Sequence, residues 1–288
     1  MKVDGILLCG GRGTRLLPTT SYLNKHLIPI YDKPMVYYSL SILLMSGIKN
    51  ISIIHNSNDR NQFEDLLEDG TQFGIKIKYV EQPDAGGIPE AINLATEEGS
   101  ERKTVTVLGD NFIFGEKFYT KLEEIINNTE MSSIFSQVVK SPEEFGVVQT
   151  DSSNKIVNIV EKPKEFISNL AVIGLYVFDN SYKKHFKNIK KSERGEFEII
   201  DIVKSYGLEN VNHNYIGRGT AWFDMGTTNS FYKCSSFVKT IQDEQGLLVC
   251  SPHEIALRNG WVDKNHLSNY LDSIKDSEYS ENLQYLMR

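Results

Sequence analysis

The stretch Leu7-Leu8-Cys9-Gly10-Gly11-Arg12-Gly13-Thr14-Arg15-Leu16 decides the fold of this chain. Residues 3–8 form a short, mostly apolar run that predicts a buried strand, and three glycines and two arginines follow it. A strand that ends in a glycine-rich loop brings bare backbone N–H groups close to an anionic ligand. Arginine supplies planar, permanently charged donors that match phosphate oxygens. The loop, together with Lys25 further along, therefore predicts a phosphate site.

Two known phosphate motifs do not fit this loop. A P-loop requires a Lys-Ser or Lys-Thr pair after its second glycine, and none follows at that spacing. A dinucleotide-binding fingerprint requires a third glycine where this chain has Leu16. A purely structural explanation is a tight strand-to-helix turn whose arginines are merely solvated. Because three glycines and several cations converge on one short segment, phosphate binding is favoured over that explanation.

The composition is that of an ordinary globular protein. The 288 residues can form one large α/β domain or two small ones. The net charge of −7 disfavours nucleic acid or an anionic membrane as a partner, so the phosphate-binding cations must be local. The three cysteines and six histidines show no zinc spacing, and the cysteine usage suits a reducing compartment. With no signal peptide or transmembrane segment, the sequence predicts a cytoplasmic protein.

Strands and helices alternate through the first half of the chain. The expected strands are residues 3–8, 51–55, 75–80 and 104–108, and the expected helices are residues 35–45, 59–67 and 90–98. This alternation predicts parallel βαβ units in a doubly wound, mostly parallel, Rossmann-like α/β sheet. Ligands of such sheets bind outside the carboxyl ends of the strands. The first turn, residues 82–87 and residues 109–111 are therefore expected to face one crevice.

The pattern changes after about residue 133. Strands joined by short turns are expected at residues 134–139, 146–149, 156–161 and 171–178, followed by helices near 181–186 and 196–206 and a strand near 211–216. No linker separates the two halves, which predicts a smaller antiparallel, substrate-binding lobe on the same sheet. A helix at residues 231–241 and a helical packet from Ser251 onward complete the chain.

Four charged residues are candidates for chemistry. Asp110 follows an expected strand in Leu-Gly-Asp-Asn, and Asp224 lies in Ala-Trp-Phe-Asp-Met-Gly-Thr. One carboxylate from each of two loops, completed by substrate phosphates and water, suits Mg²⁺. Each aspartate alone would equally suit a turn or an N-cap, but a nearby phosphate loop favours the metal. Lys162 and Arg194 would, on their own, be read as solvated surface cations.

In this order, the motifs resemble those of the sugar-1-phosphate nucleotidylyltransferases, most closely the short glucose-1-phosphate thymidylyltransferases. The resemblance is carried by residues 10–16, Lys25 with 27–35, 108–111, 145–148, 161–163, 174–176, 194–199, 217–227, 245–247 and 250–256. It covers nearly the whole chain. The motifs are specific for the family and less so for its individual substrates.

The resemblance implies a reaction in which a sugar 1-phosphate attacks the α-phosphorus of a nucleoside triphosphate and releases pyrophosphate. The substrates would be dTTP, with UTP as the alternative, and glucose 1-phosphate or a related sugar phosphate. Arg15, Lys25 and Lys162 would be catalytic, and Asp110 and Asp224 would hold Mg²⁺. Nucleotide binding would fall to Leu8, Gly10, Gly11, Gly13, Thr14, Gln82 and Gly87. Sugar-phosphate binding would fall to Gly146, Glu161, Val172, Tyr176 and Arg194.

The resemblance also implies an assembly and a division of the chain. It implies a homo-oligomer, a dimer of dimers, that makes a nucleoside-diphosphate sugar such as a dTDP-sugar. The nucleotidyltransferase domain would span residues 1–240, with a nucleotide half at about 1–133 and a sugar-binding half at about 134–240. Residues 241–288 would form a C-terminal helical extension.

Several residues depart from the usual pattern of the thymidylyltransferases. His26 stands in place of glutamine, residues 85–90 replace Pro-Asp-Gly-Leu-Ala-Gln, and Ile173 and Met225 each replace a threonine. A pocket discriminates a single methyl group by only about 1–3 kcal/mol, so the choice between thymine and uracil and the identity of the sugar stay open. A uridylyltransferase for a different sugar phosphate and a catalytically silent regulatory subunit would also carry such motifs. Retention of both aspartates with the three catalytic cations argues against the silent subunit.

Overall fold

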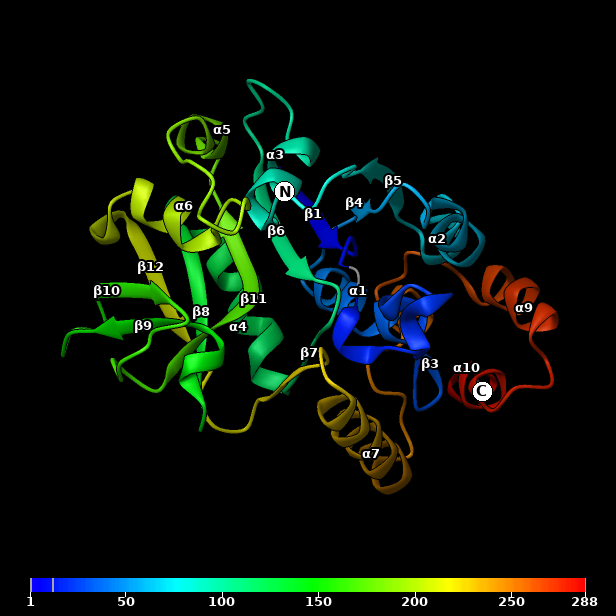
Figure 1. Cartoon of the computed structure of the whole chain (residues 1–288). Helices are drawn as coiled ribbons and strands as arrows, with labels where there is room; N and C mark the ends of the chain where they lie inside the picture. The colour runs from blue at the N-terminus through cyan, green and yellow to red at the C-terminus, as the bar shows by residue number, and fades with distance from the viewer. Residues whose placement is uncertain (1, 12, 288) are drawn as a thin grey trace.

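The computed structural model describes residues 2–11 and 13–287. Within these residues, nine strands form one sheet in which β10-β9-β11-β6-β1-β4-β5 are neighbours in that order, while β8 pairs with β11 and β12 (Figure 1). The strands are β1 (Val3–Leu8), β4 (Asn50–His55), β5 (Lys76–Glu81), β6 (Lys103–Leu108), β8 (Ser132–Val138), β9 (Gly146–Thr150), β10 (Ile156–Glu161), β11 (Leu170–Phe178) and β12 (Val211–Tyr215).

The half of the sheet built from the first part of the chain is parallel. β1 pairs in parallel with β4 on one side and with β6 on the other, and β5 continues beside β4. The strand order therefore reverses at β1, and ligands of open α/β sheets bind at the carboxyl ends of the strands at such a point. The predicted doubly wound arrangement is confirmed, and the glycine-rich turn lies at the reversal.

Helices cover both faces of the sheet. One hydrophobic core contains side chains of α1 (Met35–Met45), α2 (Arg60–Leu67), α4 (Glu116–Asn128) and α8 (Pro252–Arg258). A second core contains side chains of α3 (Ile88–Ala95), α5 (Tyr182–Phe186) and α6 (Ile199–Ser205). Along β1, Leu7 belongs to the first core while Ile6 and Leu8 belong to the second, as the alternation of a strand requires.

The sequence does not predict every element. It places none at residues 116–128, where α4 buries only a narrow stripe of Phe118, Leu122 and Ile126 and begins at Gly115 without a side-chain cap. The helix expected to reach residue 98 ends at Ala95, because Thr96 adopts an extended conformation. The sequence also does not predict the short ribbon of β7 (Asn111–Phe114) and β13 (Ala221–Asp224), which pair across more than a hundred residues.

The second half of the chain joins the same sheet, as predicted. β11 runs antiparallel to β6, β8 and β9, and β9 is antiparallel to β10. β12 is the exception to the expected antiparallel arrangement, since it pairs with β8 in parallel. These strands lie on the left of Figure 1, beside the parallel half.

Helices complete the chain. α7 (Thr228–Gln245) runs through residue 240, where the division into domain and extension is predicted. α8 contributes Ile255 and Ala256 to a core of the main sheet, while α9 (Lys264–Ser273) and α10 (Glu278–Met287) form a small cluster of their own. None of the helices in the described part of the chain has the length and apolar character needed to span a bilayer.

Candidate active site

The first turn is fixed between the two strands that flank β1. The Cys9 amide donates to the Ile54 carbonyl at 2.7 Å, and the Gly109 amide donates to the Leu8 carbonyl at 2.9 Å. A side chain at residue 109 would collide with its surroundings, since a Cβ there would lie 2.8 Å from the Leu8 carbonyl oxygen. Arg12, one of the two arginines predicted to bind phosphate, lies outside the described residues.

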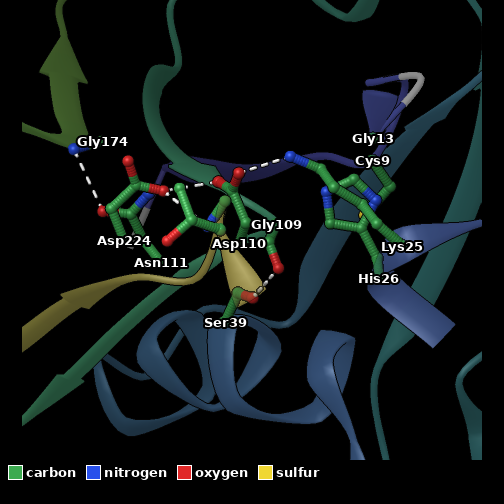
Figure 2. Close-up of polar contacts among 12 residues, drawn as sticks. Cys9, Gly13, Lys25, His26, Ser39, Gly109, Asp110, Asn111, Gly174 and Asp224 are labelled. Atoms are coloured by element: carbon green, nitrogen blue, oxygen red, sulfur yellow. Dashed lines mark hydrogen bonds and ion pairs between the residues drawn. The ribbon is translucent and has the colours of Figure 1, made fainter. Parts of the chain in front are cut away.

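Lys25 and Asp110 form an ion pair at the end of β6 (Figure 2). Their side chains are only 12% and 10% exposed. Burial by itself would raise the pKa of Asp110, but the ammonium of Lys25 and a hydrogen bond from it outweigh burial and lower that pKa. Asp110 therefore stays ionised. The pair holds a carboxylate and an ammonium at the centre of the predicted crevice.

His26, next to Lys25, is a buried and neutral residue. Its backbone amide and Nδ1 lie 2.9 and 2.7 Å from the Asn24 Oδ1 oxygen, which caps the short helical turn Lys25–Leu27. Burial, and then the charge of Lys25, lower the pKa of His26 to about 3. This residue stands in place of the usual glutamine, and in its neutral form it adds no charge beside Lys25.

The β7–β13 ribbon brings the two predicted metal ligands together. Asp224 is the register partner of Asn111, and the Met225 amide donates to the Asp110 carbonyl at 2.9 Å. Burial, and then the neighbouring carboxylate of Asp110, raise the pKa of Asp224. Residues more than a hundred positions apart thus present two carboxylates to one place (Figure 2).

Asn111 ties this ribbon to β11, in the second half of the sheet. Its Oδ1 accepts hydrogen bonds from the Gly174 amide at 3.2 Å and from the Trp222 indole N–H at 2.6 Å. The register of β11 against β8 shifts between Val172 and Tyr176, around Gly174. A Cβ at Gly174 would lie 2.6 Å from the Asn111 amide nitrogen, so only glycine at residue 174 leaves room for the Asn111 side chain. Asn111 therefore fixes the two carboxylates relative to the second half of the sheet.

Two cavities meet at Asp110. The smaller, of about 210 Å³, is lined by the first turn, Lys25, His26 and the turn before α3. Its lining includes the predicted nucleotide-binding residues Leu8, Gly10, Gly11, Gln82 and Gly87. We call it the base-side cavity. Gly87 has a φ of 94° and packs against Phe197, whose carbonyl oxygen would lie 2.2 Å from a Cβ at residue 87.

The larger cavity, of about 640 Å³, opens over β9, β10 and β11. We call it the sugar-side cavity. It is lined by all of Gly146, Glu161, Lys162, Val172 and Tyr176, and also by Thr14, Arg15, Asp110 and Asp224. Glycine at residue 146 leaves room for Glu161, whose Oε2 would lie 3.1 Å from a Cβ there. Burial raises the pKa of Glu161, against the opposing charge of Lys162.

Arg194 is the one predicted sugar-phosphate residue absent from the lining of either cavity in the described chain. Its guanidinium is paired with Glu198 at 2.7 Å and lies 4.0 Å from Glu161, and its side chain is 50% exposed. The hydrogen bond that it donates to Glu198 raises the pKa of Arg194, so the charge is permanent. Gly13 also lies outside both cavities. Its φ of 61° shapes the start of the turn Thr14–Leu16.

Sequence reasoning assigned no role to several residues of the site. Glu196 and Ile88 line both cavities, and Asn111, Phe145 and Trp222 line the sugar-side cavity. Glu196 and Asn111 stand inside the motifs Arg-Gly-Glu-Phe-Glu and Leu-Gly-Asp-Asn, so their proximity to Arg194 and Asp110 was a usable signal. Trp222 has no such signal, because its place depends on the β7–β13 pairing.

The two carboxylates fit a cation that completes its shell with substrate oxygens. In residues 2–11 and 13–287, no group of three or more His, Cys, Asp or Glu side chains is arranged to hold a metal ion. Mg²⁺ is bound by one or two carboxylates together with substrate phosphates and water. The pairing of Asp224 with Asn111 and the hydrogen bond from the Met225 amide to the Asp110 carbonyl set the two carboxylates in the same region. Asp110 and Asp224 therefore fit Mg²⁺.

The fold and the site define a class of proteins. Residues 4–241 match the nucleotidyl transferase family, and the chain belongs to that family. It is 41% identical over 288 residues to the glucose-1-phosphate thymidylyltransferase of Neisseria meningitidis serogroup A, covering 99% of each chain. It is 37% identical over 284 residues to that of Mycobacterium tuberculosis, covering 98% of each chain.

Solved structures show the same architecture. A protein from Bacillus anthracis, assigned as a glucose-1-phosphate thymidylyltransferase and solved with a sucrose, has a TM-score of 0.74 and 34% identity over 82% of this chain and 94% of its own. A UDP-glucose pyrophosphorylase in complex with UDP-glucose has a TM-score of 0.72 at 20% identity, over 84% of this chain and all of that chain, and shares the fold alone.

The resemblance and the fold class read from the sequence are both confirmed. The chain is an enzyme, a nucleotidyltransferase with a Rossmann-like sheet, antiparallel additions and C-terminal helices. Enzymes of this family act on a nucleoside triphosphate and a sugar phosphate, and they are generally metal-dependent.

Proposed function

We propose that this enzyme transfers a thymidylyl group from dTTP to glucose 1-phosphate, releasing pyrophosphate and forming a dTDP-sugar. Relatives at 37% to 41% identity over nearly the full chain carry the name of this activity. The observation that carries the proposal is the meeting of two cavities at Asp110, beside Lys25 and Asp224. A nucleotide in one cavity and a sugar phosphate in the other would bring their phosphates together at that point.

The base-side cavity supplies the nucleotide contacts. Leu8, Gly10 and Gly11 would lie under the nucleoside, and Gln82 and Gly87 would read the base. The triphosphate would then run toward Lys25 and, past Asp110, toward Thr14 and Arg15. Arg15 and Lys25 would balance the charge that develops on the departing pyrophosphate, since fixed cations at a water-poor site stabilise such charge strongly.

The sugar-side cavity supplies the acceptor. Glu161, Gly146, Val172 and Tyr176 would contact the sugar, while Lys162 and Arg194 would hold its phosphate. Arg194 would have to leave Glu198 to do so, and it starts 4.0 Å from Glu161 at the edge of the cavity. These contacts would aim a phosphate oxygen at the α-phosphorus, in line with the bond that breaks.

No general base is required for this transfer. The attacking group is a phosphate monoester, which is already anionic at neutral pH. When bound by Asp110 and Asp224, Mg²⁺ would neutralise charge on the phosphates. The protein's own part is to position the two substrates, keep Asp110 ionised beside Lys25, and hold Asp224 and Arg15 at the same junction.

The remaining predictions concern assembly, boundaries and location. The homo-oligomer, a dimer of dimers, stays a prediction that light scattering of the purified protein tests. The division of the chain at residue 240 also stays a prediction, and the passage of α7 through that residue is the feature to test by truncation. The cytoplasmic location likewise stays a prediction.

The direct test measures pyrophosphate release with Mg²⁺ and glucose 1-phosphate, comparing dTTP, UTP, CTP, ATP and GTP. We expect release with dTTP to be highest and to stop when the metal is chelated. Equal or faster release with UTP would reassign the base, since the residues around Gln82 and Gly87 depart from the usual thymidylyl pattern. Silence with all five nucleotides, and then with a panel of different sugar phosphates, would overturn the proposal.

A further inference from the structure

A third cavity, which we call the amino-end cavity, lies at the opposite end of the parallel strands from the active site. It has a volume of about 430 Å³ and opens at the amino-terminal ends of β1, β4, β5 and β6, near the N-terminus of the chain in Figure 1. Within the described chain, it shares no lining residue with the base-side or the sugar-side cavity. A strand of six residues is about 20 Å long, so roughly that length separates the cavity from Asp110 at the end of β6.

The strands place polar residues on a face of the sheet that is normally apolar. Parallel strands covered on both faces usually carry near-continuous apolar runs. Here each of β1, β4, β5 and β6 contributes one polar residue to the cavity at a covered position, namely Asp4, Ser52, Lys78 and Thr104. These residues alternate along their strands with those that pack toward the first core, so they lie on the face that α3 covers. Because α3 ends at Ala95, this polar row opens into a cavity.

The charges that line the amino-end cavity leave two cations for a ligand. Arg102 donates from Nε to the Asp4 Oδ2 oxygen at 2.6 Å, so these two charges compensate each other. The other carboxylate of the lining, Glu97, is exposed. Among the residues that the structure describes, no carboxylate forms an ion pair with Lys76 or Lys78. The two lysines stand at alternate positions of β5, on one face of the strand, and ammonium groups so placed suit the oxygens of a phosphate.

The remaining polar groups of this cavity suit a ligand that carries hydroxyls. The Thr104 side chain is buried, and its Oγ1 has no hydrogen-bond partner in the described part of the chain. A buried hydroxyl without a partner is destabilising, so a ligand group that reaches it is favoured. The last carbonyl groups of a helix have no partner within the helix, and Ala95 and Thr96 bring those of α3 to the cavity. Carbonyl groups and the Glu97 carboxylate only accept hydrogen bonds, which hydroxyls donate.

We propose that the amino-end cavity binds a phosphorylated sugar, as a ligand site separate from the active site. The phosphate would lie between Lys76 and Lys78, and the sugar hydroxyls would face Thr104 and the end of α3. The volume of about 430 Å³ is in the range of small-molecule sites. The proposal does not depend on the reaction at Asp110, because the two places share no lining residue in the described chain.

The test measures how far a sugar phosphate protects individual lysines of the full chain from acetylation. The protein is treated with acetic anhydride alone, with glucose 6-phosphate, with ribose 5-phosphate or with inorganic phosphate, and mass spectrometry quantifies each lysine. Because the readout is specific to each lysine, binding at the active site is seen separately at Lys162. We expect at least one sugar phosphate to protect Lys76 and Lys78 several-fold. Lys117, an exposed lysine of α4, should not be protected.

Variants connect the protection to the cavity. In Lys78→Met and in Thr104→Val, the sugar phosphate concentration that protects Lys76 should rise by about tenfold, whereas Lys117→Met is the matched control and should leave it unchanged. Thermal unfolding verifies that each variant is folded, and Lys78→Met should keep its full rate of pyrophosphate release.

Four results would overturn the proposal. They are no protection of Lys76 and Lys78 by either sugar phosphate, equal protection of Lys117, equal protection by inorganic phosphate, and unchanged protection of Lys76 in both test variants. If the protection pattern holds while no nucleotide supports turnover, the proposed function fails and the amino-end cavity remains a sugar phosphate site.

Discussion

The two cavities that meet at Asp110 are built differently. In the base-side cavity the polar groups are already engaged with one another: Lys25 with Asp110, and Gln82 with Glu90. In the sugar-side cavity, three times as large, the cations are exposed, and Arg194 is paired with Glu198 at the rim. A prebuilt site loses little entropy on binding, whereas an open one must order its side chains around the ligand. We therefore expect substitutions on the base side to affect folding and activity together, and those on the sugar side to affect binding or turnover with little effect on folding.

Lys25→Ala should give the largest effect. The nearly buried Asp110 carboxylate then has no cation beside it. We expect this loss to lower the free energy of unfolding by about 3 kcal/mol. Turnover should fall by about 10²–10³-fold, because one fixed charge donor is lost. Urea denaturation and pyrophosphate release measure the two effects. The double variant Lys25→Ala/Asp110→Asn should recover stability without recovering activity, and a single variant as stable as wild type would contradict the comparison.

Arg15→Ala should separate chemistry from stability. Arg15 is exposed at the junction of the cavities, where its guanidinium lies close to Gly226 and Asp224. We expect turnover to fall by about 10²–10³-fold with the melting temperature unchanged. Arg60→Ala, at an exposed arginine of α2 paired with Glu64, is the matched control and should retain activity. Wild-type turnover in folded Arg15→Ala would remove Arg15 from the site.

Arg194→Ala should raise the KM for the sugar phosphate by about tenfold, the scale of one hydrogen bond to a charged group. Its effect on nucleotide affinity and on stability should be negligible, because the side chain is half exposed. Glu198→Gln is a complementary variant that releases Arg194 from its carboxylate. Since a surface pair is worth less than about 1 kcal/mol, it should lower the KM by no more than a few-fold. A fall in kcat with an unchanged KM would show that Arg194 does not act by binding the sugar phosphate.

His26→Gln should change how stability depends on pH. The pKa of His26 is about 3 in the folded protein, below its usual value near 6.5. Between these two pH values, the unfolded chain binds a proton at this histidine that the folded protein does not. The contribution of neutral His26 to the free energy of unfolding is therefore fully present above about pH 6.5. It is lost as the pH falls, by at most about 1.4 kcal/mol per pH unit. Urea unfolding between pH 7 and 5 should show a shallower slope in the variant. Equal slopes would mean that His26 is not held neutral.

The sequence determined the class of the protein and most of its site. The glycine-rich turn, Lys25, Asp110 and the alternation of strands and helices are local signals, because a strand, a turn and a helix are each specified by neighbouring residues. Glycines at residues 10, 11 and 87 and the cations of the motifs were found in this way. The resemblance then gave roles to residues such as Lys162 and Val172, because their neighbours in the sequence do not by themselves indicate a function.

Only the tertiary structure decided how these residues act on one another. The pairing of β7 with β13 sets Asp224 beside Asp110 and Trp222 beside Asn111, across more than a hundred residues of chain. The hydrogen bond from Gln82 to Glu90 and the pairing of Arg194 with Glu198 depend on side-chain directions, which residue types do not specify. Long-range pairing and the burial of charge are properties of the whole packed chain. For that reason the chemistry of the site could be read from its motifs, while the difference between its two cavities could not.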